Sequence, residues 1–381
     1  MSSELMPLYA AQLARDVYFA QSAKTRDDFL EAYKADMEVE KATMATGTTG
    51  LRILSKPHVM AVFSAGKGAY KGHAFVAVKG TASLYDALTD LNAGLRTSHT
   101  GSAVHQGFYY AFNSIFTELT DFVSGLRGVH AIHCVGHSLG GAIATLAADW
   151  IKASMAIPEV NLYTFGSPRV GLEMFAQKCT SRVKEENIYR VYHQTDPIPM
   201  VPTWPFRHVP TSNADYLVYS PLAAKPWEYH LMKHYISSSK KAVNWSAMID
   251  KRPKGHLDAA VERWLTSDGV LSLTANTLEL MDAALLYVVK KAINATGIFV
   301  VTGAASTFTL LDRLAMFIAN AGKVSADVTV WVYHLMRKMA SLIGITVKEG
   351  TDLTVSFIRI VFLRLHHKVS EMVLQVSRYI D

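Results

Sequence analysis

A short apolar strand that turns at once into an alanine-rich helix is the feature that most constrains the fold of this chain. Residues 132–135 are typical of a buried strand and residues 141–152 of a helix, and Gly136-His-Ser-Leu-Gly140 stands between them. The G-x-S-x-G pattern alone is weak. In a strand–turn–helix setting it predicts a sharp turn that exposes the Ser138 hydroxyl. Glycines suit this turn because it packs backbone against backbone, with no room for Cβ atoms.

The residues around this turn continue the alternation of strand and helix. Apolar runs at 75–78, 160–165 and 188–193 predict strands, and 108–123 has helical spacing. Strands that alternate with helices predict a mainly parallel sheet covered by helices, which is an α/β fold. The chain has 381 residues, 50% of them hydrophobic, so it is long enough to bury a sizeable core and too apolar to be disordered.

A serine hydroxyl becomes a strong nucleophile only when a base takes its proton and an acid orients that base. In folds built on such a turn the chain order is Ser, then Asp or Glu, then His. Asp196 directly follows the predicted strand 188–193, in Thr195-Asp-Pro-Ile-Pro199. We therefore predict that Asp196 is the orienting acid. Read alone, it is equally typical of an Asp that initiates a turn before proline.

The base has several candidates. The histidines after Asp196 are His208, His230, His234 and His256. His208 follows Asp196 so closely that a structural role is favoured. His230 and His234 are spaced by one helical turn, so both could face the same way. The residues themselves leave the choice between these two open.

Five motifs occur in a fixed order: Lys79-Gly-Thr81, Gly107-Phe108, Val135-Gly-His-Ser-Leu-Gly-Gly141, Thr164-Phe-Gly-Ser-Pro-Arg-Val-Gly171 and Asp196-Pro-Ile-Pro199. Together, over about residues 60–240, they resemble the class 3 lipases. This α/β-hydrolase family includes fungal triacylglycerol lipases and many bacterial lipases and phospholipases. The resemblance implies a base in a His-x-Met/Leu-x-x-Tyr segment. His230-Leu-Met-Lys-His-Tyr235 fits it with His230 as the base, and His234 remains the alternative.

The oxyanion hole needs two N–H donors. The turn itself aims the backbone N–H of Leu139 into the pocket, and the resemblance implies a second donor at Thr81. Lys79 stands where many family members carry Arg. The resemblance also implies a short amphipathic lid at 82–96, which would cover an apolar acyl pocket. The alternative is that Asp86 and Asp90 in that segment have a structural role instead.

The C-terminal third differs in composition. All 12 prolines lie at or before Pro253, and helical apolar stripes run through 278–288 and 358–380. We predict a lipase domain over 1–265 and a helical domain over 266–381. The helices could face a membrane, face a partner protein or simply cap the core. The charge-free segment 292–311 is long enough to span a bilayer but polar for such a helix.

These features together predict an enzyme that hydrolyses acyl esters of lipids, with a phospholipase of the A1 or A2 type favoured over a triacylglycerol lipase. An alternative makes the C-terminal helices a membrane-binding or pore-forming toxin to which the hydrolase is auxiliary. The N-terminus has no Sec-type signal peptide pattern. The resemblance to bacterial effectors of contact-dependent (type VI) secretion implies leaderless export to a target membrane. It also implies a neutralising immunity protein or a secretion-apparatus component as partner.

Composition argues against other classes. The formal net charge of +6 contains no dense Lys/Arg run, so nucleic acid is not expected as a partner, whereas an anionic membrane surface suits it. Two cysteines make no disulfide framework. No metal-ligand spacing or phosphate-binding loop is recognisable, so no metal and no cofactor are expected.

Overall fold

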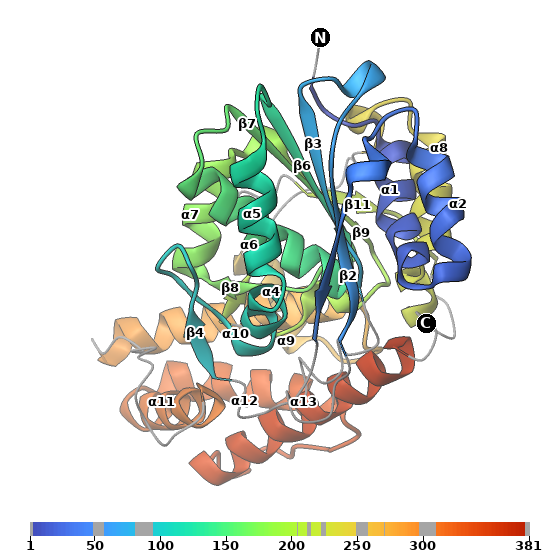
Figure 1. Cartoon of the computed structure of the whole chain (residues 1–381). Coiled ribbons are helices and arrows are strands. Elements are labelled where there is room, and N and C mark those ends of the chain that lie inside the picture. Colours follow the sequence, from blue (N-terminus) through green and yellow to red (C-terminus); the bar gives the residue numbers. More distant parts are fainter. Residues whose placement is uncertain are drawn as a thin grey trace. The chain divides into compact units, whose positions relative to one another are not determined.

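The structure is a computed structural model that describes residues 3–48, 57–80, 94–203, 205–211, 215–221, 226–248, 258–269, 271–296 and 310–377. The chain divides into two compact units (Figure 1). One unit is Met1–Arg252 with Leu374–Asp381, and the other is Pro253–Val373. The second unit begins at the last proline of the sequence, where the composition changes. The domain limit between residues 265 and 266 stays a prediction.

A mostly parallel sheet forms the centre of the first unit. Within the described residues it has seven strands in the order β1-β2-β3-β6-β7-β9-β11. Strands β3, β6, β7, β9 and β11 pair in parallel, whereas β1 with β2 and β2 with β3 pair antiparallel. The predicted mainly parallel sheet is confirmed. The strands are β1 (Thr43–Gly47), β2 (His58–Ala65), β3 (His73–Val78), β6 (Ala131–His137), β7 (Glu159–Phe165), β9 (Ile188–His193) and β11 (Tyr216–Val218).

The central strands are apolar because helices cover both faces of the sheet. All residues of β6 and β9 are buried. On one face, α1 (Pro7–Asp16) packs against β3, β6 and β7 and beside α8 (Met232–Lys241). On the other face, α6 (Leu139–Ser154) contacts β3, β6 and β7. Figure 1 shows α1, α2 (Ala23–Tyr33) and α8 on one side and α5, α6 and α7 (Glu173–Val183) on the other.

The predicted helix over 108–123 is wrong as a single element. The structure has α4 (Gln106–Asn113) and α5 (Phe116–Gly125). The Ser114 hydroxyl donates to the Ala111 carbonyl at 2.7 Å, and Ile115 has φ −115° and ψ 6°, which is not helical. A serine that bonds its own preceding turn competes with the backbone ladder, and the chain bends there.

A smaller antiparallel sheet has the order β10-β8-β5-β4. Its strands are β4 (Leu95–Thr97), β5 (Ala103–His105), β8 (Gly171–Leu172) and β10 (Phe206–Arg207).

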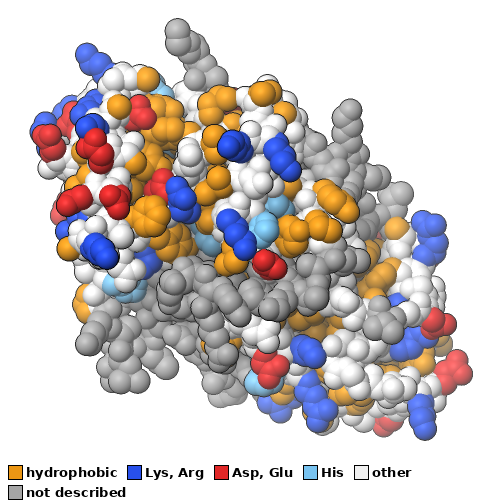
Figure 2. All heavy atoms as spheres, turned by 90° about the vertical axis from the view of Figure 1, so that its right-hand side faces the viewer, with side chains coloured by type: hydrophobic (Ala, Val, Ile, Leu, Met, Phe, Trp, Pro, Cys, Tyr) orange, Lys and Arg blue, Asp and Glu red, His pale blue; other side chains and the backbone are white. Residues whose placement is uncertain are grey.

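On the face of the first unit that carries α1, α2 and α8, Lys, Arg, Asp and Glu side chains are mixed with hydrophobic ones (Figure 2). Met6 and Phe19 are exposed at the two ends of the α1 region, at 50% and 37%.

The second unit is helical, as predicted for this part of the chain. Its helices are α9 (Asp258–Thr266), α10 (Ala275–Thr296), α11 (Leu310–Val324), α12 (Ala326–Leu342) and α13 (Val355–Ser377), the last of which runs past Val373. The predicted apolar stripe of α10 is buried: Leu278, Met281, Leu285 and Val288. Arg337 donates to the carbonyls of Leu265, Thr266 and Ser267 and so satisfies the C-terminal end of α9.

Among the described residues, every helix is too short or too polar to cross a bilayer. Residues 297–309, which make up most of the segment 292–311, lie outside the described part of the chain.

Candidate active site

Ser138 occupies a strained turn between β6 and α6. Its φ of 56° and ψ of −130° lie in a region that side-chain-bearing residues rarely adopt. The flanking glycines make this turn possible. A Cβ on Gly136 would lie 2.3 Å from the carbonyl carbon of Gly140, and one on Gly140 would lie 2.3 Å from the carbonyl oxygen of Val78. The strand–turn–helix predicted from the sequence is therefore present.

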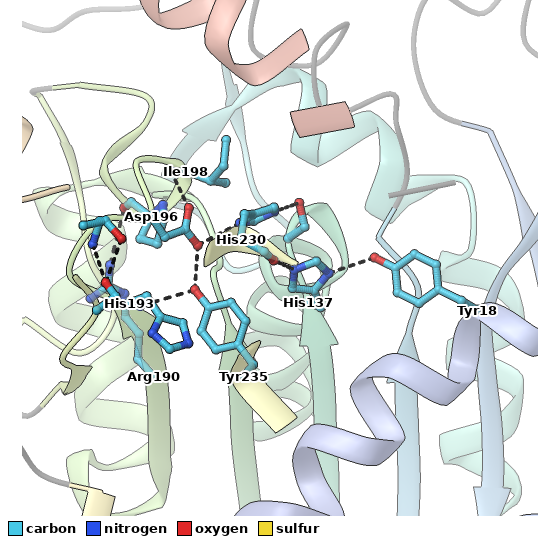
Figure 3. Close-up of polar contacts among 12 residues, drawn as sticks. Tyr18, His137, Arg190, His193, Asp196, Ile198, His230 and Tyr235 are labelled. Carbon is cyan, nitrogen blue, oxygen red and sulfur yellow. Dashed lines mark hydrogen bonds and ion pairs between the residues drawn. The ribbon is translucent and has the colours of Figure 1, made fainter. Parts of the chain in front are cut away.

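Three predicted site residues meet in one hydrogen-bonded chain (Figure 3). His230 Nε2 lies 2.9 Å from Ser138 Oγ, and His230 Nδ1 lies 2.8 Å from Asp196 Oδ2. All three residues are fully buried. A hydroxyl, an imidazole and a carboxylate in this order can pass the hydroxyl proton to the ring while the carboxylate holds the ring in place.

His230 and His234 do not share a helix face, contrary to the expectation from their spacing. His230 ends a short 3-10 turn (Pro226–His230), Leu231 is extended with φ −69° and ψ 137°, and α8 begins only at Met232. The two histidines therefore point differently. The His234 ring packs on Tyr229 with centroids 4.6 Å apart, and it is His230 that reaches Ser138.

Asp196 has further partners that the sequence argument missed. The Ile198 N–H donates to Oδ1 at 3.0 Å, and the Tyr235 hydroxyl donates to Oδ2 at 2.6 Å. Burial, and then the nearby Asp196 charge, raise the pKa of Tyr235 well above its ordinary value, so the phenol keeps the proton that it donates. The only sequence signal for Tyr235 is its place in the His230–Tyr235 motif.

Two buried arginines hold the loop that follows Asp196, residues 197–203. The backbone N–H of Arg169 donates to the Val201 carbonyl at 2.8 Å, and its Nη1 donates to the Pro202 carbonyl at 3.5 Å. Arg190 Nη2 donates to the Pro199 carbonyl at 3.4 Å. Asp215 lies 3.1 Å from the Arg190 guanidinium and balances its charge. A loop with three prolines has few N–H donors of its own, so outside donors position its carbonyls.

His208 lies beside this loop and away from Ser138. Its Nε2 accepts a hydrogen bond from Arg169 Nε at 3.2 Å. Burial, and then the charges of Arg190 and Arg169, hold the pKa of His208 well below its ordinary value, so the ring is a neutral acceptor. This is the structural role that its position near Asp196 favours. His256, the remaining candidate, lies outside the described residues.

Gly166 forms a wall of the site. It has φ 58°, and a Cβ there would lie 2.9 Å from Asp196 Oδ2 and 2.9 Å from His230 Nδ1. Real Cβ atoms do not approach other atoms so closely. A glycine is therefore required both for the backbone conformation and for the contact between Asp196 and His230.

Leu139 is the first residue of α6, next to Ser138. Its N–H has no intrahelical acceptor, because the first four N–H groups of a helix lack one. The positive end of the helix dipole also favours negative charge beside Ser138. The predicted second donor, Thr81, and the predicted lid at 82–96 with Asp86 and Asp90 lie outside the described residues, apart from 94–96.

Lys79, at the end of β3, is buried, and its Nζ donates to Gln21 Oε1. Over the part of the chain that the structure describes, no three His, Cys, Asp or Glu side chains are arranged to hold a metal ion.

Residues 75–206 match the family Lipase (class 3). The secreted mono- and diacylglycerol lipase 1 of Fusarium solani is 36% identical over 152 residues, which are 39% of this chain and 44% of that protein. Toxin TseL of Vibrio cholerae is 36% identical over 118 residues, or 30% of this chain and 18% of the toxin. The chain thus spans less than half the length of these curated relatives.

Solved lipase structures also resemble the chain. The triacylglyceride lipase of Rhizomucor miehei is 21% identical, with a TM-score of 0.39, and the match covers 53% of this chain and 76% of that one. The Lip2 lipase of Yarrowia lipolytica is 18% identical, with a TM-score of 0.39, and the match covers 57% and 79%.

Proposed function

We propose that this chain, whose residues 75–206 match the class 3 lipase family, is a serine hydrolase acting on acyl esters of lipids. The observation that carries the proposal is the buried chain of hydrogen bonds from Ser138 through His230 to Asp196. A serine on a strained turn at a helix N-terminus, bonded to an imidazole that a carboxylate orients, suits nucleophilic acyl transfer.

The first half-reaction forms an acyl-enzyme. Ser138 Oγ attacks the ester carbonyl while His230 Nε2 takes its proton, and the Asp196 carboxylate stabilises the imidazolium that results. The carbonyl oxygen becomes an oxyanion, which the Leu139 N–H and the α6 dipole stabilise. The carbon–oxygen bond to the alcohol then breaks, and His230 Nε2 returns the proton to the departing alcohol.

The second half-reaction repeats these steps with water. His230 Nε2 takes a proton from water as the water oxygen attacks the acyl-enzyme, and the tetrahedral intermediate collapses when Ser138 Oγ leaves and regains a proton. The sum is one ester and one water converted to one fatty acid and one alcohol. Every proton moves through His230, so no outside acid or base is needed.

The proposed substrate is a membrane phospholipid, cut in the manner of an A1 or A2 phospholipase. The positive formal charge of +6 supports an anionic lipid surface as the place of action. The fungal relatives are named for mono- and diacylglycerol, so neutral glycerides are the alternative substrates.

The test is incubation of the full chain with vesicles that contain phosphatidylcholine, phosphatidylglycerol, diacylglycerol and triacylglycerol, with mass spectrometry of the products. We expect free fatty acid and lysophospholipid from the wild type and neither from Ser138→Ala. Fatty acid together with monoacylglycerol or an increase in diacylglycerol, without lysophospholipid, would reassign the substrate to neutral lipid. Equal fatty-acid release by Ser138→Ala would refute the assignment of the nucleophile.

We also propose that the protein acts as an antibacterial effector that an immunity protein holds inactive in its producer. The support is its similarity to Toxin TseL over 118 residues. Expression in the periplasm of a sensitive bacterium should lyse or arrest the cells, and Ser138→Ala should not. Full toxicity of Ser138→Ala, together with vesicle leakage by that variant, would favour the helical unit as the toxic part instead.

A further inference from the structure

His137, the residue before the nucleophile, links the turn that carries Ser138 to the segment that carries the base His230. Its Nε2 lies 2.8 Å from the backbone carbonyl oxygen of His230, and its ring centroid lies 4.6 Å from that of His230. His230 is the last residue of the 3-10 turn Pro226–His230, and the extended Leu231 follows it, so the turn ends at the His230 carbonyl. The bond from His137 therefore anchors the backbone of the base to the turn that carries Ser138.

The other nitrogen of this ring faces the N-terminal part of the chain. His137 Nδ1 lies 3.0 Å from the hydroxyl of Tyr18, which belongs to the short helix Val17–Gln21 (Figure 3). The two hydrogen bonds have fixed directions. A carbonyl only accepts, so Nε2 carries the proton, and the Nδ1 of a neutral ring must then accept from the Tyr18 hydroxyl.

The neutral state of His137 has a physical cause. The side chain is buried, and burial, followed by the neighbouring His230, holds the pKa of His137 well below its ordinary value. A neutral imidazole has two tautomers. The His230 carbonyl selects the one with the proton on Nε2, because the other tautomer would set two acceptors against each other there, and the Tyr18 hydroxyl then donates to the free Nδ1.

Tyr18 also lies against the end of β3. A Cβ on Gly80 would lie 2.3 Å from the Tyr18 hydroxyl oxygen and 3.2 Å from Ser138 Cβ. The amino group of Lys79 lies 5.9 Å from the centre of the Tyr18 ring, and it also donates to Gln21. The helix Val17–Gln21 thus contacts the residues that immediately precede Thr81, the predicted oxyanion donor, as well as His137.

We propose that Tyr18, which lies outside the segment that matches the lipase family, is a positioning residue that holds the His137 ring by its hydrogen bond to Nδ1 and through it the backbone of the base His230. The inference rests on the proposed hydrolase function. Tyr18 acts on the acyl-transfer step through His137 and does not touch the ester. Its loss should therefore lower kcat and leave KM nearly unchanged.

The test compares Tyr18→Phe with Tyr9→Phe in the full chain. Tyr9 lies on α1, and its ring packs on Tyr33 and Tyr70, away from His137. With p-nitrophenyl butyrate as a soluble ester, we expect Tyr18→Phe to lower kcat about ten-fold, with KM within two-fold of wild type. Tyr9→Phe should change neither value by more than two-fold. A Tyr18→Phe enzyme with wild-type kcat would overturn the inference.

A double-mutant cycle separates positioning from general loss of stability. In a His137→Gln background, Tyr18→Phe should lower kcat less than two-fold further, since its target is gone. A second full ten-fold loss there would show that Tyr18 acts by another route and would overturn the proposal. A stability loss that acts independently would multiply in both backgrounds.

A spectroscopic measurement does not depend on turnover. In the full chain with ¹⁵N-labelled histidine, the side-chain signals that disappear in His137→Gln should be those of a neutral Nε2–H tautomer in the wild type, and Tyr18→Phe should shift the Nδ1 signal. An Nδ1–H tautomer would overturn the proposal. A wild type with the expected tautomer but no esterase activity would overturn only the proposed function.

Discussion

Tyr235 and His230 share a single oxygen of the site carboxylate. The Tyr235 hydroxyl donates to Asp196 Oδ2 at 2.6 Å, and His230 Nδ1 lies 2.8 Å from the same atom. The other oxygen, Oδ1, accepts from the Ile198 N–H. Three groups therefore hold the carboxylate in one orientation, with Oδ2 directed at the imidazole.

Tyr235→Phe should therefore remove one hydrogen bond to Asp196 without adding atoms that would displace His230. We expect kcat on p-nitrophenyl butyrate to fall about ten-fold, equivalent to about 1.4 kcal/mol, which is the size of one hydrogen bond to a charged group. Tyr33→Phe is the matched control, since the buried Tyr33 hydroxyl donates to Asp16 at 3.0 Å, far along the chain from Asp196. Equal losses of kcat in both variants would contradict a specific role for Tyr235.

Gly166→Ala should disable the site more severely. The added Cβ would lie 2.9 Å from both Asp196 Oδ2 and His230 Nδ1, so the two side chains must separate. We expect kcat to fall at least a hundred-fold. Because the Gly166 φ of 58° also disfavours alanine, a stability loss of about 1–2 kcal/mol should accompany it.

Gly128→Ala controls for that backbone cost. Gly128 has φ 65°, and a Cβ there would meet nothing within 4 Å. It should lose similar stability in urea denaturation while keeping kcat within about two-fold of wild type. A Gly166→Ala enzyme that is as active as Gly128→Ala would contradict the close packing of Asp196 and His230.

Stability should fall in mild acid because buried histidines are held neutral. Burial, and then the neighbouring His73 and His130, lower the pKa of His133 from 6.5 to about 3. The unfolded chain therefore binds a proton at this residue between these values while the folded chain does not. The free energy of unfolding is unaffected above about pH 7. It falls as the pH drops below about 6.5, by up to roughly 1.4 kcal/mol per pH unit for this residue.

Denaturant unfolding at pH 7, 6 and 5 checks this sign. His133→Gln should make the loss of unfolding free energy between pH 7 and pH 5 smaller than in the wild type, by about 2 kcal/mol. His99→Gln, at an exposed histidine, controls for the substitution itself. A steeper loss in His133→Gln would contradict a neutral buried His133.

The sequence predicts the centre of the fold better than its edges. The strands β3, β6, β7 and β9 are apolar runs because both of their faces are buried, and each was recognisable. The outer strand β11 has three residues, all only partly buried, and carries no such run. The break between α4 and α5 depends on the hydrogen bond of one hydroxyl, that of Ser114, which helical spacing does not register.

The site divides in the same way. Ser138 and Asp196 follow strands, so local sequence indicates both. No predicted strand precedes His230, and its spacing of one helical turn does not distinguish it from His234. The structure distinguishes them because Leu231 between them is extended. Tyr18 reaches the site only through contacts between distant parts of the chain, and no local pattern encodes such contacts. Gly166 belongs to the Thr164–Gly171 motif, but the motif does not show that this glycine contacts Asp196 and His230.

The central claim is that His230 and Asp196 activate Ser138 as a nucleophile. Intact-mass spectrometry after incubation with an alkyl fluorophosphonate in mixed micelles tests it directly. We expect one covalent adduct on the wild type, located at Ser138 by peptide mapping, none on Ser138→Ala, and labelling at least a hundred-fold slower in His230→Ala. An unlabelled wild type, or equal labelling of wild type and Ser138→Ala, would contradict the claim.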